Sequence, residues 1–546
     1  MAILAFDWGT MTFLSNRLML MLCYVAVLSL VAPTAIAKTS EDISKTTKLK
    51  PSLAETHYHD GQEPLPLPDV VTKLLKKYKI TEDNLSVYIR DLNADKPLLE
   101  HNIDEMRNPA STMKLLTTYA GLKELGPNFS WRTEVYLRGD MDESGVLDGD
   151  LILKGFGDPF LVYENFWKII KNLRVKGLNV IKGNVIIDNS YFELSDHNAE
   201  EFDGKPFRVY NAESSALMFN FQATRFLFKP KLSEEEQKKR LEKTKRKKKV
   251  RKRKRKSSRE PIGLVEVTPY PNIIGFKFDN QLKLINGKCR RSHSSPKFIK
   301  GDDDTLIIKG NYAYSCGQKF ILRTVSLPEE HVFNAFRDFW TDLKGELHGE
   351  LRRGKVQSGD ERFHTYSSPS LGDQIRLINK WSNNVMTRQL LLTLGAKKFG
   401  TPGTLEKGKQ AVLDILEENE IDTGAGDQKI TLENGSGLSR KALISARQMA
   451  GLLETAYRDA YMPEFISSLA VTGVDGTLVN RFRSDDLRGR SHFKTGTLNF
   501  VTTIAGYMLN RKGKRLVIVI QHNGKKTGGG RAKKIQDALL RWSFES

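Results

Sequence analysis

The sequence predicts an α/β protein whose body is interrupted by a strand-rich insertion. Three observations support this prediction: a strongly helical segment over 110–125, a return of helical periodicity after Ser367, and a series of short strand-like segments between about 139 and 364. The chain has 546 residues, of which 39% are apolar, so it can bury more than one core. We therefore expect a body made of residues 69–138 and 365–546, split by accessory domains at 139–364.

Within the body, helical spacing of apolar residues alternates with short runs typical of strands. Before the insertion we expect a helix over 70–79, a strand over 85–91, and the helix over 110–125, which Asn108 caps and Gly126-Pro127 ends. Inside the insertion, the expected strands are 146–153, 183–188 and 305–309, with one helix over 165–173. After it, the expected helices are 371–381, 385–394, 407–419 and 445–459, followed by strands at 492–498, 502–509 and 516–521 and a last helix over 532–542.

The N-terminal segment has the pattern of a signal peptide. Arg17 precedes the apolar run Leu18–Val31, and Ala35-Ile36-Ala37 offers a cleavage site of small residues. The run is shorter than the about 20 residues that a transmembrane helix needs, and an uncleaved anchor is the alternative. We expect a signal peptide at 1–37 and a polar, proline-containing linker at 38–68, which predicts export to the periplasm or cell envelope.

Cysteine use fits an exported protein. Removal of the signal peptide leaves Cys289 and Cys316, which either form a disulfide or remain two separate buried thiols. The sequence has no C-x-x-C motif and no zinc-ligand spacing, and His57 and His59 lie in the polar linker. We therefore expect no metal site.

Most of the positive charge is concentrated in one tract. The formal net charge is +21, yet Lys238–Lys256 alone contains 15 basic residues and one acid. The tract lies within 229–260, between two strand-like flanks, and like-charge repulsion predicts an extended, solvated excursion there. In an exported protein we expect no nucleic-acid partner; the tract would contact an anionic membrane or wall surface, or else be a dispensable insertion.

Ser111 and Lys114 lie in the first turn of the predicted helix over 110–125. A spacing of three residues places both side chains on one face, so the lysine amine can reach the serine hydroxyl. A neutral amine could accept the hydroxyl proton, and the helix N-terminus favours negative charge on the oxygen. Alone this pattern is weak, because Ser-x-x-Lys also arises by chance in a chain of this composition.

Two further motifs follow on separate elements. Ser382-Asn383-Asn384 lies at a break between two helices, where a hydroxyl and a carboxamide can project into a cleft. Lys494-Thr495-Gly496-Thr497 lies on a strand; Gly496 leaves space for a ligand beside the strand, and Lys494 offers a cation for a carboxylate. Taken alone, the first motif is more simply interpreted as a helix cap, and the second as a solvated lysine on a strand. Together with the Ser-x-x-Lys pair, however, they indicate a serine enzyme.

In this order, the three motifs resemble those of the penicillin-recognising serine enzymes. Within that group the chain resembles the class C low-molecular-mass penicillin-binding proteins, the D-alanyl-D-alanine carboxypeptidase/endopeptidase family. The 271 positions from Ser111 to Ser382 leave room for the accessory domains that interrupt the catalytic domain in that family. The Lys/Arg tract and Asn383, where many relatives have Asp, depart from its pattern. The stretches that resemble the family are Asn108–Leu115, Thr117–Ala120, Leu153–Pro159, Ser382–Asn384, Asn434–Arg440 and Lys494–Leu498.

The resemblance implies a β-lactamase/transpeptidase-like catalytic domain, an antiparallel sheet with helices on both faces, and no cofactor. It implies that Ser111 attacks the carbonyl between two D-alanines, that Lys114 is the general base, and that Ser382 relays a proton to the leaving amine. The backbone N–H groups of Ser111 and Thr497 would form the oxyanion hole. The implied substrate-binding residues are Asn384, Lys494, Thr495, Gly496 and Thr497, and the implied partners are peptidoglycan peptides and β-lactams.

Two other functions fit parts of the sequence. A β-lactamase or esterase of the same superfamily would hydrolyse penicillin quickly, whereas a penicillin-binding protein would keep a long-lived adduct on Ser111. A non-catalytic wall- or polyanion-binding protein would use the Lys/Arg tract and carry a vestigial active site. In the accessory region, Asp196 and Asp203 are either contacts for the substrate side chain or surface turns, and the sequence favours surface turns.

Overall fold

The computed structural model describes residues 64–194, 198–245, 261–273, 277–302, 305–528 and 530–546. The predicted signal peptide at 1–37 and the linker up to residue 63 lie outside these residues. Among the helices in the described ranges, none is long and apolar enough to cross a membrane.

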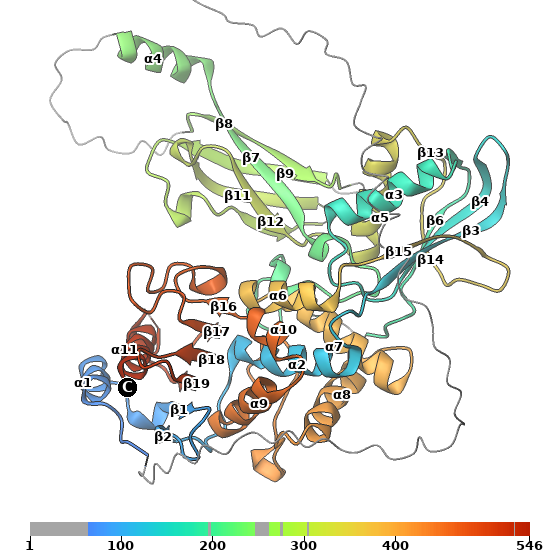
Figure 1. Cartoon of the computed structure of the whole chain (residues 1–546). Helices are drawn as coiled ribbons and strands as arrows, with labels where there is room; N and C mark the ends of the chain where they lie inside the picture. Colours follow the sequence, from blue (N-terminus) through green and yellow to red (C-terminus); the bar gives the residue numbers. More distant parts are fainter. Residues whose placement is uncertain (1–63, 195–197, 246–260, 274–276, 303–304, 529) are drawn as a thin grey trace, which may run out of the picture. The chain divides into compact units, whose positions relative to one another are not determined.

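The body is built on a six-stranded sheet in which every neighbouring pair of strands is antiparallel. The strand order is β16-β17-β18-β19-β1-β2. Strands from both ends of the chain, blue and red in Figure 1, therefore share one sheet. The bounds are β1 Leu85–Asp91, β2 Leu99–His101, β16 Ala470–Val471, β17 Ser491–Leu498, β18 Val501–Leu509 and β19 Arg515–Asn523.

Helices cover both faces of this sheet, as predicted. Because strand side chains alternate between faces, Ala505 and Tyr507 on β18 pack into one apolar cluster, while Ile504 and Met508 pack into another. The second cluster includes α1 (Asp69–Tyr78) and α11 (Arg531–Glu545). The helices of the first cluster are α2 Lys114–Leu125, α6 Leu371–Trp381, α7 Asn384–Phe399, α8 Leu405–Glu418, α9 Ala446–Arg458 and α10 Met462–Ser467.

A second sheet, of seven strands, lies in the insertion. Its main order is β13-β5-β4-β3-β15, with β6 beside β4 and β14 beside β6. The helices α3 (Tyr163–Val175) and α5 (Pro328–Asp342) pack on one face through a shared apolar cluster. The bounds are β3 Arg132–Met141, β4 Val146–Gly155, β5 Val180–Ile181, β6 Val185–Asp188, β13 Glu346–Leu347, β14 Leu351–Arg353 and β15 Glu361–Ser367.

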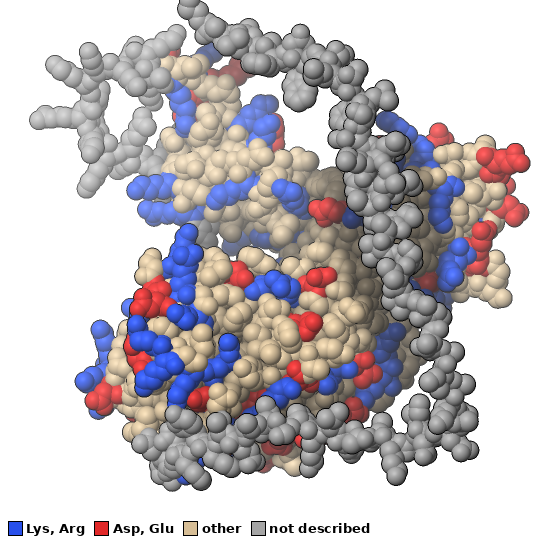
Figure 2. Space-filling view, viewed as in Figure 1, with Lys and Arg blue, Asp and Glu red and all other residues tan. Residues whose placement is uncertain are grey.

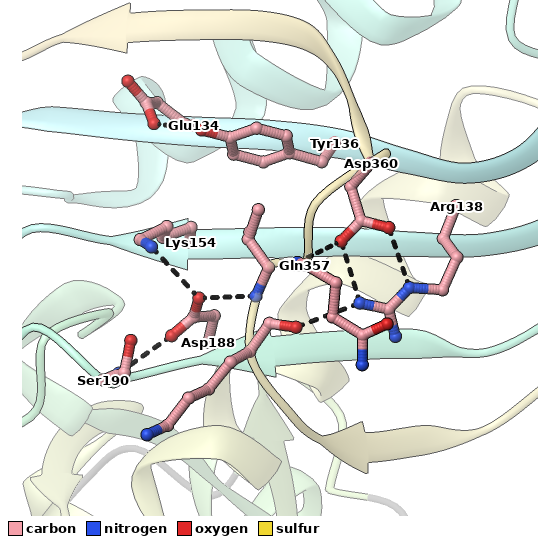
Figure 3. Close-up of polar contacts among 10 residues, drawn as sticks. Glu134, Tyr136, Arg138, Lys154, Asp188, Ser190, Gln357 and Asp360 are labelled. Atoms are coloured by element: carbon pink, nitrogen blue, oxygen red, sulfur yellow. Dashed lines mark hydrogen bonds and ion pairs between the residues drawn. The ribbon is translucent and has the colours of Figure 1, made fainter.

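A loop between β14 and β15 is tied to this sheet by charged side chains (Figure 3). Arg138 on β3 donates to both carboxylate oxygens of Asp360, at 2.9 and 2.8 Å, and to the Lys355 carbonyl at 3.0 Å. Asp188, at the end of β6, accepts from the backbone N–H of Val356 at 2.9 Å and is fully buried. The loop is therefore fixed at both ends.

Two three-stranded sheets form a separate apolar core within the insertion. Their orders are β12-β7-β8 and β10-β11-β9, and Phe226, Phe298 and Ile308 are buried between them. Cys289 and Cys316 form a disulfide beside this core, which settles the question that the sequence left open. The bounds are β7 Thr224–Leu232, β8 Gly263–Tyr270, β9 Lys277–Ile285, β10 Lys297–Lys300, β11 Thr305–Ala313 and β12 Lys319–Arg323.

The prediction of an extended Lys/Arg tract is wrong for its first part. Residues 238–245 belong to a helix, α4 (Glu234–Lys245), that starts with three glutamates. Acidic residues stabilise a helix N-terminus, and Glu235 and Glu236 pair with Lys239 and Arg240 one turn later. The rest of the tract, from residue 246, lies outside the described residues.

Candidate active site

Ser111 lies on a short 3₁₀ turn that leads directly into α2. The turn covers Ala110–Met113, and α2 begins at Lys114. The prediction that Asn108 caps the helix is wrong: Pro109 precedes the 3₁₀ turn and Met113 precedes α2, while Asn108 accepts from the N–H of Ala110, which has a left-handed φ of 46°, at 2.9 Å. The turn brings the Nζ of Lys114 to 3.2 Å from the Oγ of Ser111.

Lys114 is fully buried and has two further hydrogen-bond acceptors. Its Nζ donates to the side-chain oxygen of Asn384 at 2.5 Å and to the carbonyl of Ser436 at 2.6 Å. Burial lowers the pKa of Lys114 well below 10.5, and the nearby positive charges of Lys494 and Arg388 lower it further. These conditions favour the neutral amine, the form that can accept a proton.

Ser382 and Lys494 form the second pair of the site. Ser382 ends α6 in a left-handed conformation with φ 58°, and Asn384 begins α7. The Nζ of Lys494, on β17, donates to the Oγ of Ser382 at 2.9 Å and to the Thr495 carbonyl at 2.8 Å. Lys494 is fully buried, and this burial lowers its pKa to about 7.

Gly496 allows β17 to pass directly beside the nucleophile turn. A Cβ at this position would lie 2.2 Å from the Oγ1 of Thr503, 2.6 Å from the Pro109 carbonyl and 2.9 Å from the backbone nitrogen of Ser111. The sequence suggested that the missing side chain makes space for a ligand. The structure shows that it also makes space for the turn that carries Ser111.

The two threonines of this motif lie at the open edge of the sheet. Only His492 and Phe493 of β17 pair with the two-residue strand β16 among the described residues. The Oγ1 of Thr495 donates to the Oγ1 of Thr477 at 2.8 Å, and Thr497 is exposed. An extended peptide can therefore lie along this edge.

A loop for which the sequence analysis assigned no role completes the site. The stretch Asn434–Arg440 was identified only as part of a resemblance, yet Ser436 supplies a carbonyl to Lys114. Gly437 has φ 72°, and a Cβ there would lie 1.8 Å from the Ala110 carbonyl, so the loop packs closely against the nucleophile turn. In the sequence, only Gly435 and Gly437 of this loop indicate a tight turn of this kind.

Asn383 and Asp203, two further residues considered in the sequence analysis, form hydrogen bonds within the protein. Asn383 caps α7, since its side-chain oxygen accepts from the Met386 N–H at 3.1 Å; an aspartate there could cap the helix in the same way. Asp203 accepts from the Tyr210 hydroxyl at 2.8 Å and from the Asn211 amide at 3.0 Å. Asp196 lies outside the described residues.

A pocket of about 360 Å³ opens next to the Asn434–Arg440 loop, and none of the predicted catalytic or substrate-binding residues lines it. One wall belongs to the body and includes Arg388 and Leu391 on α7 together with Asn434 and Leu438–Arg440. Residues 211–214 of the insertion form part of the other wall. In the described part of the chain, no group of three or more His, Cys, Asp or Glu residues could hold a metal ion.

Substitution of Gly496 by alanine is expected to slow acylation of Ser111 by about 100-fold. The new Cβ would collide with backbone atoms, and a displacement of about 1 Å in an active site costs on the order of 100-fold in rate. The measurement is the rate of penicillin labelling. Gly451→Ala is the matched control, because a Cβ on that α9 residue meets no atom within 4 Å and should leave the rate unchanged. Equal rates for wild type and Gly496→Ala would contradict this packing.

Comparison with known proteins identifies relatives of this chain. The D-alanyl-D-alanine carboxypeptidase of Actinomadura sp. (strain R39) is 25% identical over 474 residues, which cover 83% of this chain and 80% of that protein. D-alanyl-D-alanine carboxypeptidase DacB of Haemophilus influenzae is 23% identical over 465 residues, covering 84% and 89%. The crystal structure of penicillin binding protein 4 from Haemophilus influenzae has the same fold, with a TM-score of 0.69, 20% identity, and coverage of 87% of this chain and 99% of that chain.

One family matches nearly the whole described chain. The D-Ala-D-Ala carboxypeptidase 3 (S13) family matches residues 67–545, a range that includes the body, the insertion and every residue of the site. The sequence motifs, the sheet with helices on both faces and this match agree, so the chain belongs to the D-Ala-D-Ala carboxypeptidase 3 (S13) family.

Proposed function

We propose that the chain is a serine-type D-alanyl-D-alanine carboxypeptidase that acts on peptidoglycan stem peptides through an acyl-enzyme on Ser111. The observation that supports this most strongly is the placement of Lys114, whose Nζ lies 3.2 Å from the Ser111 Oγ while Asn384 and Ser436 accept its other hydrogen bonds. A neutral amine that donates both its hydrogens to these two acceptors directs its lone pair at the serine hydroxyl. Lys114 is thus suited to be the general base.

In the acylation step, the Oγ–H bond of Ser111 breaks and its proton passes to the Nζ of Lys114. The Oγ forms a bond to the carbonyl carbon of the penultimate D-alanine, and the carbon–nitrogen bond to the terminal D-alanine breaks. Ser382 relays a proton to the leaving nitrogen: it donates its own hydroxyl proton and takes up the one held by Lys114, so that both side chains return to their starting forms. Because Lys494 already donates to the Ser382 Oγ, the serine hydrogen is available for this step. Water then hydrolyses the ester. When the leaving amine belongs to a peptide cross-link, the same step is an endopeptidase reaction.

The other predicted residues would bind the substrate. Lys494 supplies a positive charge for the terminal carboxylate, Thr495 and Thr497 line the open edge of β17, and Asn384 contacts the substrate backbone. The N–H groups of Ser111 and Thr497 would stabilise the developing oxyanion. Gly496 keeps these two backbone segments close enough for a shared oxyanion hole. β-Lactams would acylate the same serine.

The pH dependence of peptide cleavage tests this assignment. At low pH we expect kcat/KM to rise with pH, as Lys114 loses its proton at a pKa below its usual value. Above about pH 7, Lys494 loses its positive charge in the free enzyme, so kcat/KM should fall for a peptide that ends in a free D-Ala-D-Ala carboxylate. For the same peptide with an amidated C-terminus, the falling limb should be absent. Identical profiles for the two peptides would contradict the role of Lys494.

We also propose an exported enzyme that uses the Lys/Arg tract Lys238–Lys256 to stay near an anionic membrane or wall surface. Lys and Arg side chains also gather over the β7–β12 strands next to α4 (Figure 2). Each basic residue near an anionic surface contributes on the order of 1 kcal/mol, and the attraction fades within about 8 Å at physiological salt.

Deletion of Lys238–Lys256 is expected to weaken binding to vesicles of anionic lipid and to flatten its salt dependence. Acylation of Ser111 by penicillin should not change, because the tract lies in the insertion and not in the body. Vesicle sedimentation at low and high salt measures the first effect. Equal binding by the wild-type and deleted proteins at low salt would show that the tract is a dispensable insertion.

A further inference from the structure

Two neighbouring side chains of α7 hold a segment of the insertion through its main chain. Arg388 donates to the carbonyls of Tyr210 and Ala212, at 3.1 and 2.6 Å. Gln389 is fully buried; its Nε2 donates to the Ser215 carbonyl at 2.6 Å, and its Oε1 accepts from the Ser215 N–H at 3.3 Å. All four hydrogen bonds therefore end on backbone atoms of residues 210–215, which we call the wall segment.

The wall segment forms one side of the pocket that α7 and the Asn434–Arg440 loop also line. Glu213 and Ser214, which lie between the points held by Arg388 and Gln389, line this pocket. The opposite side includes the loop that supplies the Ser436 carbonyl to Lys114. Arg388 also lies one helical turn after Asn384 on α7. The distance between α7 and the wall segment thus sets the width of this pocket, which is connected to Lys114 through the loop that contains Ser436.

The wall segment is anchored from its other side as well. The Oγ of Ser215 and the N–H of Leu217 both donate to the side-chain oxygen of Asn189, at 2.9 and 2.8 Å. Asn189 in turn donates to Glu329 on α5 at 3.0 Å. Asn189 follows Asp188, which Lys154, Ser190 and Val356 hold on the seven-stranded sheet (Figure 3). The segment is therefore fixed between this sheet and α7.

We propose that Gln389 is a positioning residue for the peptidase reaction. By holding Ser215, it keeps the wall segment at the distance from α7 at which the pocket receives the part of the stem peptide that precedes the two terminal D-alanines. The inference rests on the proposed function, because it assumes that a peptide reacts at Ser111. Arg388 holds the same segment, but its charge also lowers the pKa of Lys114, so it is a less specific probe.

The test compares a long and a short reactant in Gln389→Met, which keeps the side-chain length and removes both hydrogen bonds. For a pentapeptide ending in D-Ala-D-Ala, we expect KM to rise about tenfold with kcat within about twofold of wild type. Acylation by 6-aminopenicillanic acid, a β-lactam without an acyl side chain, should keep its wild-type rate because this molecule does not extend into the pocket. The control is Thr393→Val on the same helix, which removes a hydrogen bond from Trp131 and one to the backbone carbonyl of Gln389 but leaves the Gln389 side chain and its bonds to the wall segment in place. Its KM should not change.

A second variant keeps the test independent of how well Gln389→Met folds. Ser215→Ala removes the Oγ contact with Asn189 and leaves the backbone groups that Gln389 holds, so it should raise KM for the pentapeptide alone. The proposal is overturned if either variant loses peptide cleavage and 6-aminopenicillanic acid acylation in parallel, or if neither changes KM. Absence of acylation in the wild-type protein would instead refute the proposed function.

Discussion

Replacement of Ser111 by alanine is expected to abolish both the release of D-alanine and covalent labelling by penicillin. The Ser111 hydroxyl is the one that lies within hydrogen-bond distance of Lys114, whereas the Ser382 hydroxyl accepts from Lys494. The protein should still fold. Ser111 is only partly buried, and removal of one hydroxyl costs about 1 kcal/mol. The measurements are D-alanine release from a D-Ala-D-Ala peptide and the thermal unfolding temperature.

Two controls make this result specific. Thr497 is an exposed hydroxyl of the same site, and Thr497→Val should retain penicillin labelling even if peptide cleavage slows. Labelling that persists in Ser111→Ala would mean that a different residue is acylated. A large drop in the unfolding temperature of Ser111→Ala would instead mean that activity and labelling are lost because the protein no longer folds stably.

Substitution of Lys114 by arginine, which carries a permanent positive charge, should reduce acylation by about 100- to 10,000-fold. A guanidinium cannot lose its proton in a protein and so cannot accept one from Ser111. Loss of a general base costs on the order of 100- to 10,000-fold in rate. Lys114→Met, which removes the charge and fits a fully buried position, should be equally slow. The rate of acylation by penicillin, followed by mass spectrometry, measures both variants.

The comparison between the two Lys114 variants separates base catalysis from electrostatics. If Lys114→Arg acylates at nearly the wild-type rate and Lys114→Met does not, Lys114 acts only through its charge. If both are slow and the unfolding temperature of the methionine variant is unchanged or higher, the neutral amine is the required form.

The fold of the body could be predicted because its strands have strong local patterns. Successive residues of β18 point to opposite faces, so Ile504 and Ala505 pack into different apolar clusters, and the sequence shows this strand as a short, mostly apolar run. The helix over 371–381 was predicted with its observed bounds from its helical pattern, and the structure shows that Ser370 caps it. Such signals depend on residues within one or two turns of each other.

The Lys/Arg tract shows where local reasoning gave a wrong result. Repulsion among the basic residues favoured an extended chain, but the preceding glutamates were not included in that argument. Pairs four residues apart, such as Glu236 and Arg240, offset the repulsion at the start of the tract and allow α4 to form.

The sequence predicted the parts of the site that side chains contribute. Ser111, Lys114, Ser382 and Lys494 were found from motifs, and the structure brings them together. The Ser436 carbonyl and the wall segment were not predicted, because a backbone atom has no residue-type signature. Ser436 lies 322 residues from Lys114, and only the folded chain places its carbonyl beside the amine.

Peptide mapping after reaction with benzylpenicillin tests most directly whether Ser111 is the acylated nucleophile of this enzyme. Intact mass spectrometry of the wild-type protein should show a single, long-lived penicilloyl group per chain. Digestion should then place that group on the peptide that contains Ser111 and Lys114. No adduct, or an adduct on another residue, would contradict the assignment of the nucleophile. Rapid loss of the adduct with continued hydrolysis of penicillin would instead indicate a β-lactamase.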